Sequence, residues 1–168
     1  MSPFFVSLRT ALASGVITFA LGLAAAKAVH GIRSARVKRA LDVFATLPMV
    51  LPPTVAGFLL LMVFGVNRPV GRFFQEVLGI KVAFSWGATV ISAAFISFPL
   101  MYRAARGALE QLDPALSQAA RTIGMSELEL FLRVELKLGL PGVLAGGALS
   151  FARGLGEFGA TAMLAGNI

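Results

Sequence analysis

The chain has 168 residues, of which 57% are hydrophobic and 14% are charged, a composition too apolar for a water-soluble globular domain. Its net charge of +7 could suit nucleic acid, but the basic residues stand at the ends of apolar runs, so we expect membrane lipid and no nucleic acid as a partner. With no cysteine and one histidine, the chain cannot form disulfides, thiolate metal sites or a multi-histidine metal centre.

Four apolar runs are long enough to cross a bilayer as helices, which takes about 20 residues each. They cover residues 12–29, 41–66, 82–102 and 138–158. No cleaved signal peptide is indicated, because the N-terminus lacks a basic start followed by a short apolar core. The sequence therefore predicts an all-α integral membrane protein with one membrane domain. Four spans make a thin bundle, so we expect further helices from a second copy or from residues beyond Ile168.

The first connection indicates the orientation in the membrane. Residues 27–39 carry five basic side chains and no acidic one, which predicts a cytoplasmic location. The N-terminus then lies outside, the connection 67–81 faces outward, the connection 103–137 is cytoplasmic, and the chain ends outside. We expect a multi-pass protein of the inner (plasma) membrane.

Prolines interrupt the second run at Pro48, Pro52 and Pro53. They remove backbone donors and disfavour helix at the preceding residues, so we expect a kink or break there. Both a loop-to-helix entry at a membrane face and a functional hinge fit this pattern. The fourth run has a face of small residues that favours close helix packing over pore lining: Gly142, Ala145, Gly146, Gly147 and Ala148.

The connection 103–137 contains signals for two helices separated by a glycine turn. Asp113-Pro114 supplies an N-cap and a proline at the first helical position. Gly124 can end that helix in the left-handed conformation. Ser126 and Glu129 form a capping-box pattern, so a second helix is expected to begin near Glu127 and run toward the membrane.

The first of these helices has one apolar side of small and aliphatic residues, spaced three and four apart: Leu116, Ala119, Ala120 and Ile123. Such a helix suits insertion into a groove on another protein. The alternative is a helix lying on the membrane surface, which a basic polar face would favour. The connection carries five basic and five acidic residues, which favours a protein partner.

This segment resembles the EAA loop of ABC importer permeases. The family pattern is Glu-Ala-Ala, three residues, Gly, nine residues, Ile-x-Leu-Pro, and here Gln118-Ala119-Ala120, Gly124 and Val134-x-Leu136 follow the same spacing. Gln118 replaces the glutamate, and Lys137 stands in the place of the proline and can keep the helix continuous. The resemblance implies a coupling helix that docks on an ABC ATPase through Leu116, Gln118, Ala119, Ala120, Ile123 and Gly124.

Two further stretches are similar to the molybdate permease branch of this family, whose close relatives transport sulfate and thiosulfate. They are Leu47-Pro48-x-x-Leu51-Pro52-Pro53 and residues 154–168. The resemblance implies the type I ABC importer permease fold, with a five-span core that works as a homodimer. It also implies two ATPase subunits inside, a periplasmic or extracellular oxyanion-binding protein outside, and molybdate or tungstate as cargo, with sulfate or thiosulfate as the alternative. Four visible spans then imply a truncated chain that lacks the fifth span and is expected to dimerise poorly and transport little.

The chain contains no Walker-type phosphate loop, so ATP and Mg²⁺ are expected on the partner ATPase, with no cofactor and no enzymatic activity in this chain. Arg153 and Glu157 lie four residues apart near the end of the fourth run and can pair. Both charge compensation and a gate fit this pair. The gate candidates are Arg153, Glu157, Phe158 and Thr161.

Other functional classes fit less well. An aspartyl membrane protease needs two carboxylates that share a proton inside the membrane, and the acids other than Glu157 lie at run ends or in connections. A serine membrane protease needs a histidine inside the bundle, whereas His30 lies in the basic connection. An ATP-independent channel or secondary transporter is the remaining alternative, because proline-broken spans also occur there.

Overall fold

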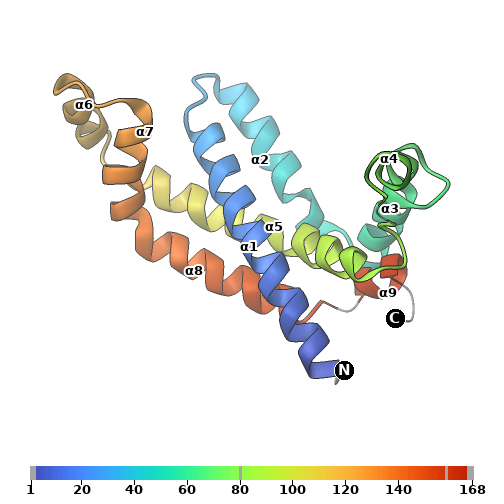
Figure 1. The fold of residues 1–168 in the computed structure, drawn as a ribbon. Helices are drawn as coiled ribbons and strands as arrows, with labels where there is room; N and C mark the ends of the chain where they lie inside the picture. The colour runs from blue at the N-terminus through green and yellow to red at the C-terminus, as the bar shows by residue number, and fades with distance from the viewer. Residues whose placement is uncertain (1–2, 80, 158, 166–168) are drawn as a thin grey trace.

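The structure is a computed structural model that describes residues 3–79, 81–157 and 159–165, and all regular structure within these ranges is helical. Figure 1 shows the arrangement. The elements are α1 (Pro3–His30), α2 (Ala35–Val50), α3 (Pro53–Phe64), α4 (Pro69–Leu78), α5 (Trp86–Glu110), α6 (Pro114–Thr122), α7 (Glu127–Leu130), a π-helical turn η1 (Phe131–Glu135), α8 (Leu136–Leu155) and α9 (Gly159–Ala165).

The centre of the bundle is α5, which packs against both α1 and α8. Glycines allow the backbones to approach, because a Cβ at Gly146 would lie 2.5 Å from the Ala104 Cβ and one at Gly22 would lie 2.7 Å from Met101. Two hydroxyl pairs join α1 to α5 across this contact, Thr18 with Ser97 and Thr10 with Thr89, each at 3.2 Å. The predicted packing role of small residues in the fourth run is confirmed at Gly146.

Three helical stretches are long and apolar enough to cross a membrane: Phe5–His30, Trp86–Glu110 and Glu127–Leu155. The pair α2 and α3 makes a fourth candidate if it is counted as one broken span, since the two helices bend by 111°. The break that the prolines predicted is confirmed at Leu51 and Pro52, both of which are extended, with ψ of 137° and 138°. Pro53 then begins α3, whereas Pro48 is accommodated inside α2.

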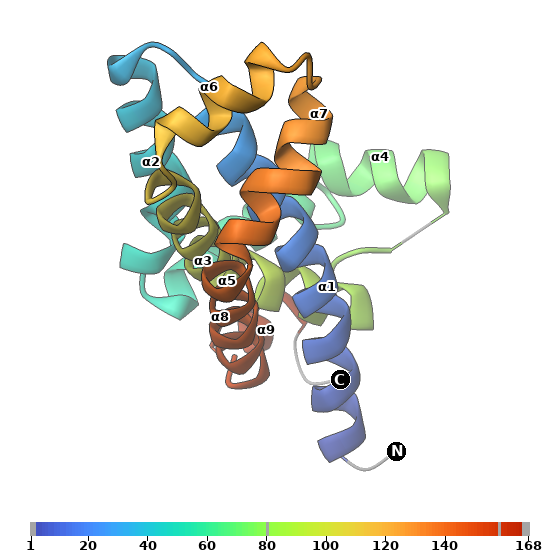
Figure 2. The ribbon, with the colours of Figure 1, turned by 90° about the vertical axis from the view of Figure 1, so that its left-hand side faces the viewer.

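Several helices differ from the expected boundaries: α1 begins at Pro3 instead of residue 12, and α2 begins at Ala35 instead of residue 41. Helix α5 continues to Glu110, eight residues past the predicted end of the third run, because no breaker interrupts it before the Asp113-Pro114 cap. The connection 67–81, for which the sequence predicted an outward position but no helix, contains α4. Figure 2 shows α4 lying lengthwise at the side of the bundle.

The close contact between α5 and α8 gives a test with a matched control. Gly146→Ala places a methyl group against Ala104, and such overpacking should destabilise the protein by about 1–3 kcal/mol. Gly107→Ala, also within a helix, meets nothing within 4 Å and should be neutral or stabilising by up to about 1 kcal/mol. Thermal unfolding of the two variants in detergent, followed by circular dichroism, measures the difference. Equal unfolding midpoints would contradict the proposed tight contact.

Candidate docking site

Helix α6 begins and ends where the sequence predicted. The Asp113 carboxylate accepts a hydrogen bond from the backbone N–H of Ala115 at 2.9 Å, and Pro114 occupies the first helical position. After α6, Gly124 adopts a left-handed φ of 84°. A Cβ at Gly124 would meet nothing within 4 Å, so the backbone angle, not crowding, requires glycine here.

A second cap and an ion pair fix α7 against α6. The predicted capping box is confirmed, because Ser126 Oγ accepts from the Glu129 backbone N–H while the Glu129 carboxylate accepts from the Ser126 backbone N–H. Arg121 Nε and Nη2 donate to the two oxygens of Glu127 at 2.6 and 3.2 Å. The hydrogen bonds to Glu127 and its negative charge raise the pKa of Arg121 above its ordinary value. The two helices therefore form one braced unit.

The outer surface of this unit includes apolar side chains that nothing in the described chain covers. Ile123 is 76% exposed, and Leu116 is also exposed, as are Gln118, Ala119 and Gly124. Ala120, which the sequence grouped with the same apolar side, is instead buried. Leu128 of α7 adds an exposed leucine that the spacing within α6 could not reveal. Apolar side chains on a rigid, solvent-exposed helix are suited to bind in a groove of another protein.

The braced unit connects to the bundle at the π-helical turn η1. Glu135, whose side chain is 3% exposed, accepts a 2.5 Å ion-pair hydrogen bond from Lys27 Nζ on α1. The same ammonium lies 5.1 Å from the centre of the Phe131 ring. Single π-helical turns inside α-helices are frequent at functional sites. The second predicted helix, α7, thus continues through η1 into α8 as expected, and α8 is unbroken at Lys137. The Lys27–Glu135 pair also ties this segment to α1.

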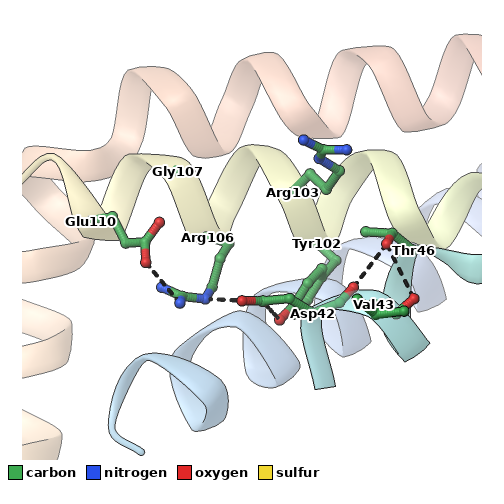
Figure 3. Close-up of a pocket in the computed structure, with 8 residues that line it drawn as sticks. All are labelled: Asp42, Val43, Thr46, Tyr102, Arg103, Arg106, Gly107 and Glu110. Atoms are coloured by element: carbon green, nitrogen blue, oxygen red, sulfur yellow. Dashed lines mark hydrogen bonds and ion pairs between the residues drawn. The ribbon is translucent and has the colours of Figure 1, made fainter. Parts of the chain in front are cut away.

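A second ionic cluster ties α2 to α5 near the same end of the bundle (Figure 3). The Tyr102 hydroxyl donates to the Asp42 carboxylate, and Arg106 Nε lies 3.4 Å from Asp42 while Nη2 lies 2.7 Å from Glu110. These side chains line a cavity of about 360 Å³, and Arg106 itself is buried. Because Asp42 and Arg106 stand on different helices, no local pattern could have predicted their contact.

Two of the predicted gate residues, Arg153 and Glu157, lie at or just after the C-terminal end of α8. Arg153 Nη1 pairs with Glu157 Oε2 at 2.8 Å, which confirms the predicted pair. The Glu157 side chain is 1% exposed and its other oxygen accepts from the backbone N–H of Ala160 at 2.8 Å, so this carboxylate also caps α9. Thr161 lies half-buried on α9. Phe158 lies outside the described residues.

In the part of the chain that the structure describes, no group of three or more histidine, aspartate or glutamate side chains could hold a metal ion.

The sequence and the structure were compared with known proteins. The family described as "Binding-protein-dependent transport system inner membrane component" matches residues 18–168. The chain is 40% identical over 167 residues to the putative molybdenum transport system permease protein YvgM of Bacillus subtilis, covering 99% of this chain and 73% of that protein. It is 49% identical over 131 residues to the molybdenum transport system permease protein ModB of Escherichia coli K12, covering 78% of this chain and 57% of that protein.

A sulfate transport system permease protein, CysT of Salmonella typhimurium, is 42% identical over 128 residues, covering 76% of this chain and 46% of that protein. Among solved structures, the inward-facing MetNI methionine ABC transporter matches with a TM-score of 0.72 and 17% identity, covering 97% of this chain and 76% of that chain. At that identity the likeness concerns the fold, which is the type I ABC importer permease fold expected from the sequence. The chain belongs to the family of binding-protein-dependent transport system inner membrane components.

Proposed function

We propose that this chain is the membrane-spanning permease subunit of an ATP-driven ABC importer for molybdate, and that α6 is its docking helix for a separate ATPase. The observation that carries this proposal is the exposed apolar surface of α6, braced by two caps and an ion pair and ended by Gly124 at positive φ. The permeases that the chain resembles in sequence include molybdenum transport proteins, which supports molybdate as cargo.

The structure supports a direct route for movement from α6 into the bundle. An ATPase that closes on ATP would displace α6, and the Arg121–Glu127 pair would carry that displacement to α7. From α7 it reaches α8 through the continuous chain at η1, and α1 through the Lys27–Glu135 pair. Two of the three central helices would then respond to one docking event. ATP and Mg²⁺ belong to the ATPase in this proposal, and this chain holds no cofactor.

The proposed assembly places a second copy of the permease beside this one and an oxyanion-binding protein on the outer side. The basic connection 27–39 and the segment 103–137 would face the cytoplasm, and the N-terminus would face outward. Selectivity for a small dianion belongs to the external binding protein, because a deep cationic site in the membrane would hold the ion too tightly. Arg153, Glu157 and Thr161 remain gate candidates at the outer end of the pathway.

Uptake by the full-length permease, reconstituted with its ATPase and binding protein, tests this function. Labelled molybdate should accumulate in vesicles only when ATP is present, and excess sulfate should not compete. Accumulation without ATP would favour a channel or secondary transporter instead. The similarity to CysT points to sulfate as the alternative cargo. Equal competition by sulfate would overturn the assignment of molybdate as cargo and leave the permease function in place.

The left-handed turn after α6 provides a test of docking. Gly124→Val forces a β-branched residue to a φ of 84°, which costs about 1–2 kcal/mol, and should reorient α6 and reduce ATPase stimulation by the binding protein. Gly79→Val is the matched control, because Gly79 has a φ of 66°, also meets nothing within 4 Å, and ends α4 instead. The hydrolysis rate with and without binding protein is measured for both. Equal loss in the two variants would count against a docking role for the segment.

The ion pair at η1 provides a second test. Lys27→Met leaves the buried Glu135 carboxylate without its partner, which should lower the free energy of unfolding by about 3–5 kcal/mol, toward the lower end because Lys27 is partly exposed. The double variant Lys27→Met/Glu135→Leu removes both charges and should recover most of that stability. Chemical denaturation in detergent measures both values. If the single and double variants were equally stable, the pair would not brace α1 against the docking unit.

A further inference from the structure

Helix α4 lies across the direction of the long helices. Figure 1 shows α4 nearly end-on, whereas α1, α5 and α8 run lengthwise in the same view, and Figure 2 shows α4 from the side. Helices that cross a bilayer run within about 40° of its normal, so a helix perpendicular to several of them lies close to the plane of the membrane. Helix α4 is separated from α3 by only a short turn, Gly65 to Arg68.

One side of α4 is held firmly on the end of α3. The rings of Phe74 and Phe64 meet edge to face with centroids 6.2 Å apart. The backbone at Gly71 sits directly on the end of α3, because a Cβ there would lie 2.6 Å from the carbonyl oxygen of Phe64. Pro69 begins the helix and Gly79 ends it in the left-handed conformation. The orientation of α4 about its own axis is therefore fixed.

That orientation leaves a second, apolar side uncovered by the described chain. Val70, Phe73 and Val77 are spaced three and four residues apart and so share one side of the helix. Phe73 is 56% exposed and Val77 is 63% exposed. The third side carries the exposed polar side chains of Arg72, Gln75 and Glu76.

The charges around α4 favour an anionic surface. Residues 67–81 contain three basic side chains, Arg68, Arg72 and Lys81, and one acidic side chain, Glu76. The three basic residues are exposed. An apolar side with a large aromatic residue, a polar side with basic residues and an axis in the membrane plane are the properties of helices that bind at the boundary of acyl chains and headgroups.

We propose that α4 is an interfacial helix that inserts Val70, Phe73 and Val77 into the leaflet opposite the docking helix, with Arg68, Arg72 and Lys81 on the phosphates of anionic phospholipids. The inference rests on the membrane placement in the proposed function and is independent of ATP coupling and substrate. Anchoring α4 in the membrane would hold the C-terminal end of α3 at a fixed depth while other helices move. Through α3 it would also restrict the break at Leu51 and Pro52, which precedes that helix.

Because the 168 residues contain no cysteine, single cysteines introduced by mutation offer labelling sites in this region. Nitroxide labels at Phe73→Cys and Val77→Cys of the full-length permease, with Gln75→Cys as the control on the polar side, are compared in vesicles of phosphatidylethanolamine and phosphatidylglycerol. Collision with oxygen, which partitions into lipid, is measured against collision with a water-soluble nickel chelate. The logarithm of the oxygen collision rate divided by the nickel-chelate collision rate should be positive at positions 73 and 77 and negative at position 75.

The dependence on anionic lipid is measured by repeating the experiment with Arg68→Gln/Arg72→Gln in the same vesicles, where the log ratio at position 73 should fall. Preferential access of the nickel chelate to positions 73 and 77 would overturn the proposal. Spin–spin broadening between labels at position 73 would show that the apolar side of α4 contacts a second copy of the permease. Immobilisation of the label only after addition of the binding protein would show that this side contacts the binding protein. Either result also overturns the proposal. None of these readouts requires transport, so loss of uptake and loss of insertion are distinguishable.

Discussion

Close packing of α5 against α1 and α8 is the contact on which the other features depend. In lipid, apolar side chains gain little by leaving the solvent, so helices associate through backbone proximity and a few polar contacts. Gly22 and Gly146 provide that proximity on the two sides of α5, and the Thr18–Ser97 pair adds a hydrogen bond. Because α5 leads directly to α6, this packing also determines the position of the braced unit.

The braced unit of α6 and α7 is locally rigid and has two attachments to the bundle. Its rigidity comes from backbone caps that are satisfied within a few residues, which leaves the apolar side chains available to a partner. Its attachments are of different kinds, a continuous helical chain into α8 and a buried ion pair with α1. A surface ion pair such as Arg121–Glu127 contributes little stability alone, but across the turn it restricts the angle between α6 and α7.

The opposite end of the molecule is organised around chain breaks. The extended Leu51 and Pro52 turn α3 away from α2, and α4 follows at the end of α3. At the end of α8, Glu157 compensates Arg153 and caps α9, so one buried carboxylate satisfies both a charge and a helix terminus. The end of the molecule that carries the braced unit thus depends on helices held by caps and ion pairs. The opposite end depends on prolines and on short helices whose directions change abruptly.

The amino-acid sequence by itself determined the features whose partners lie within a few residues of one another. The caps at Asp113 and Ser126, the left-handed Gly124 and the Arg153–Glu157 pair are of this kind, because a helix or tight turn brings such neighbours together whatever the rest of the fold. The spans were predictable because the bilayer sets a minimum apolar length.

Only the tertiary structure decided which distant residues meet. Lys27 and Glu135, or Asp42 and Arg106, carry no signal of their pairing, since each contact arises from the packing of separate helices. The burial of Ala120 depends in the same way on where α6 settles against its neighbours. Helix α4 was missed although its local signals stand in the sequence: Pro69 begins it, Gly79 ends it, and Val70, Phe73 and Val77 are spaced three and four residues apart. The tertiary structure decided only which side of the helix covers α3 and which side faces outward.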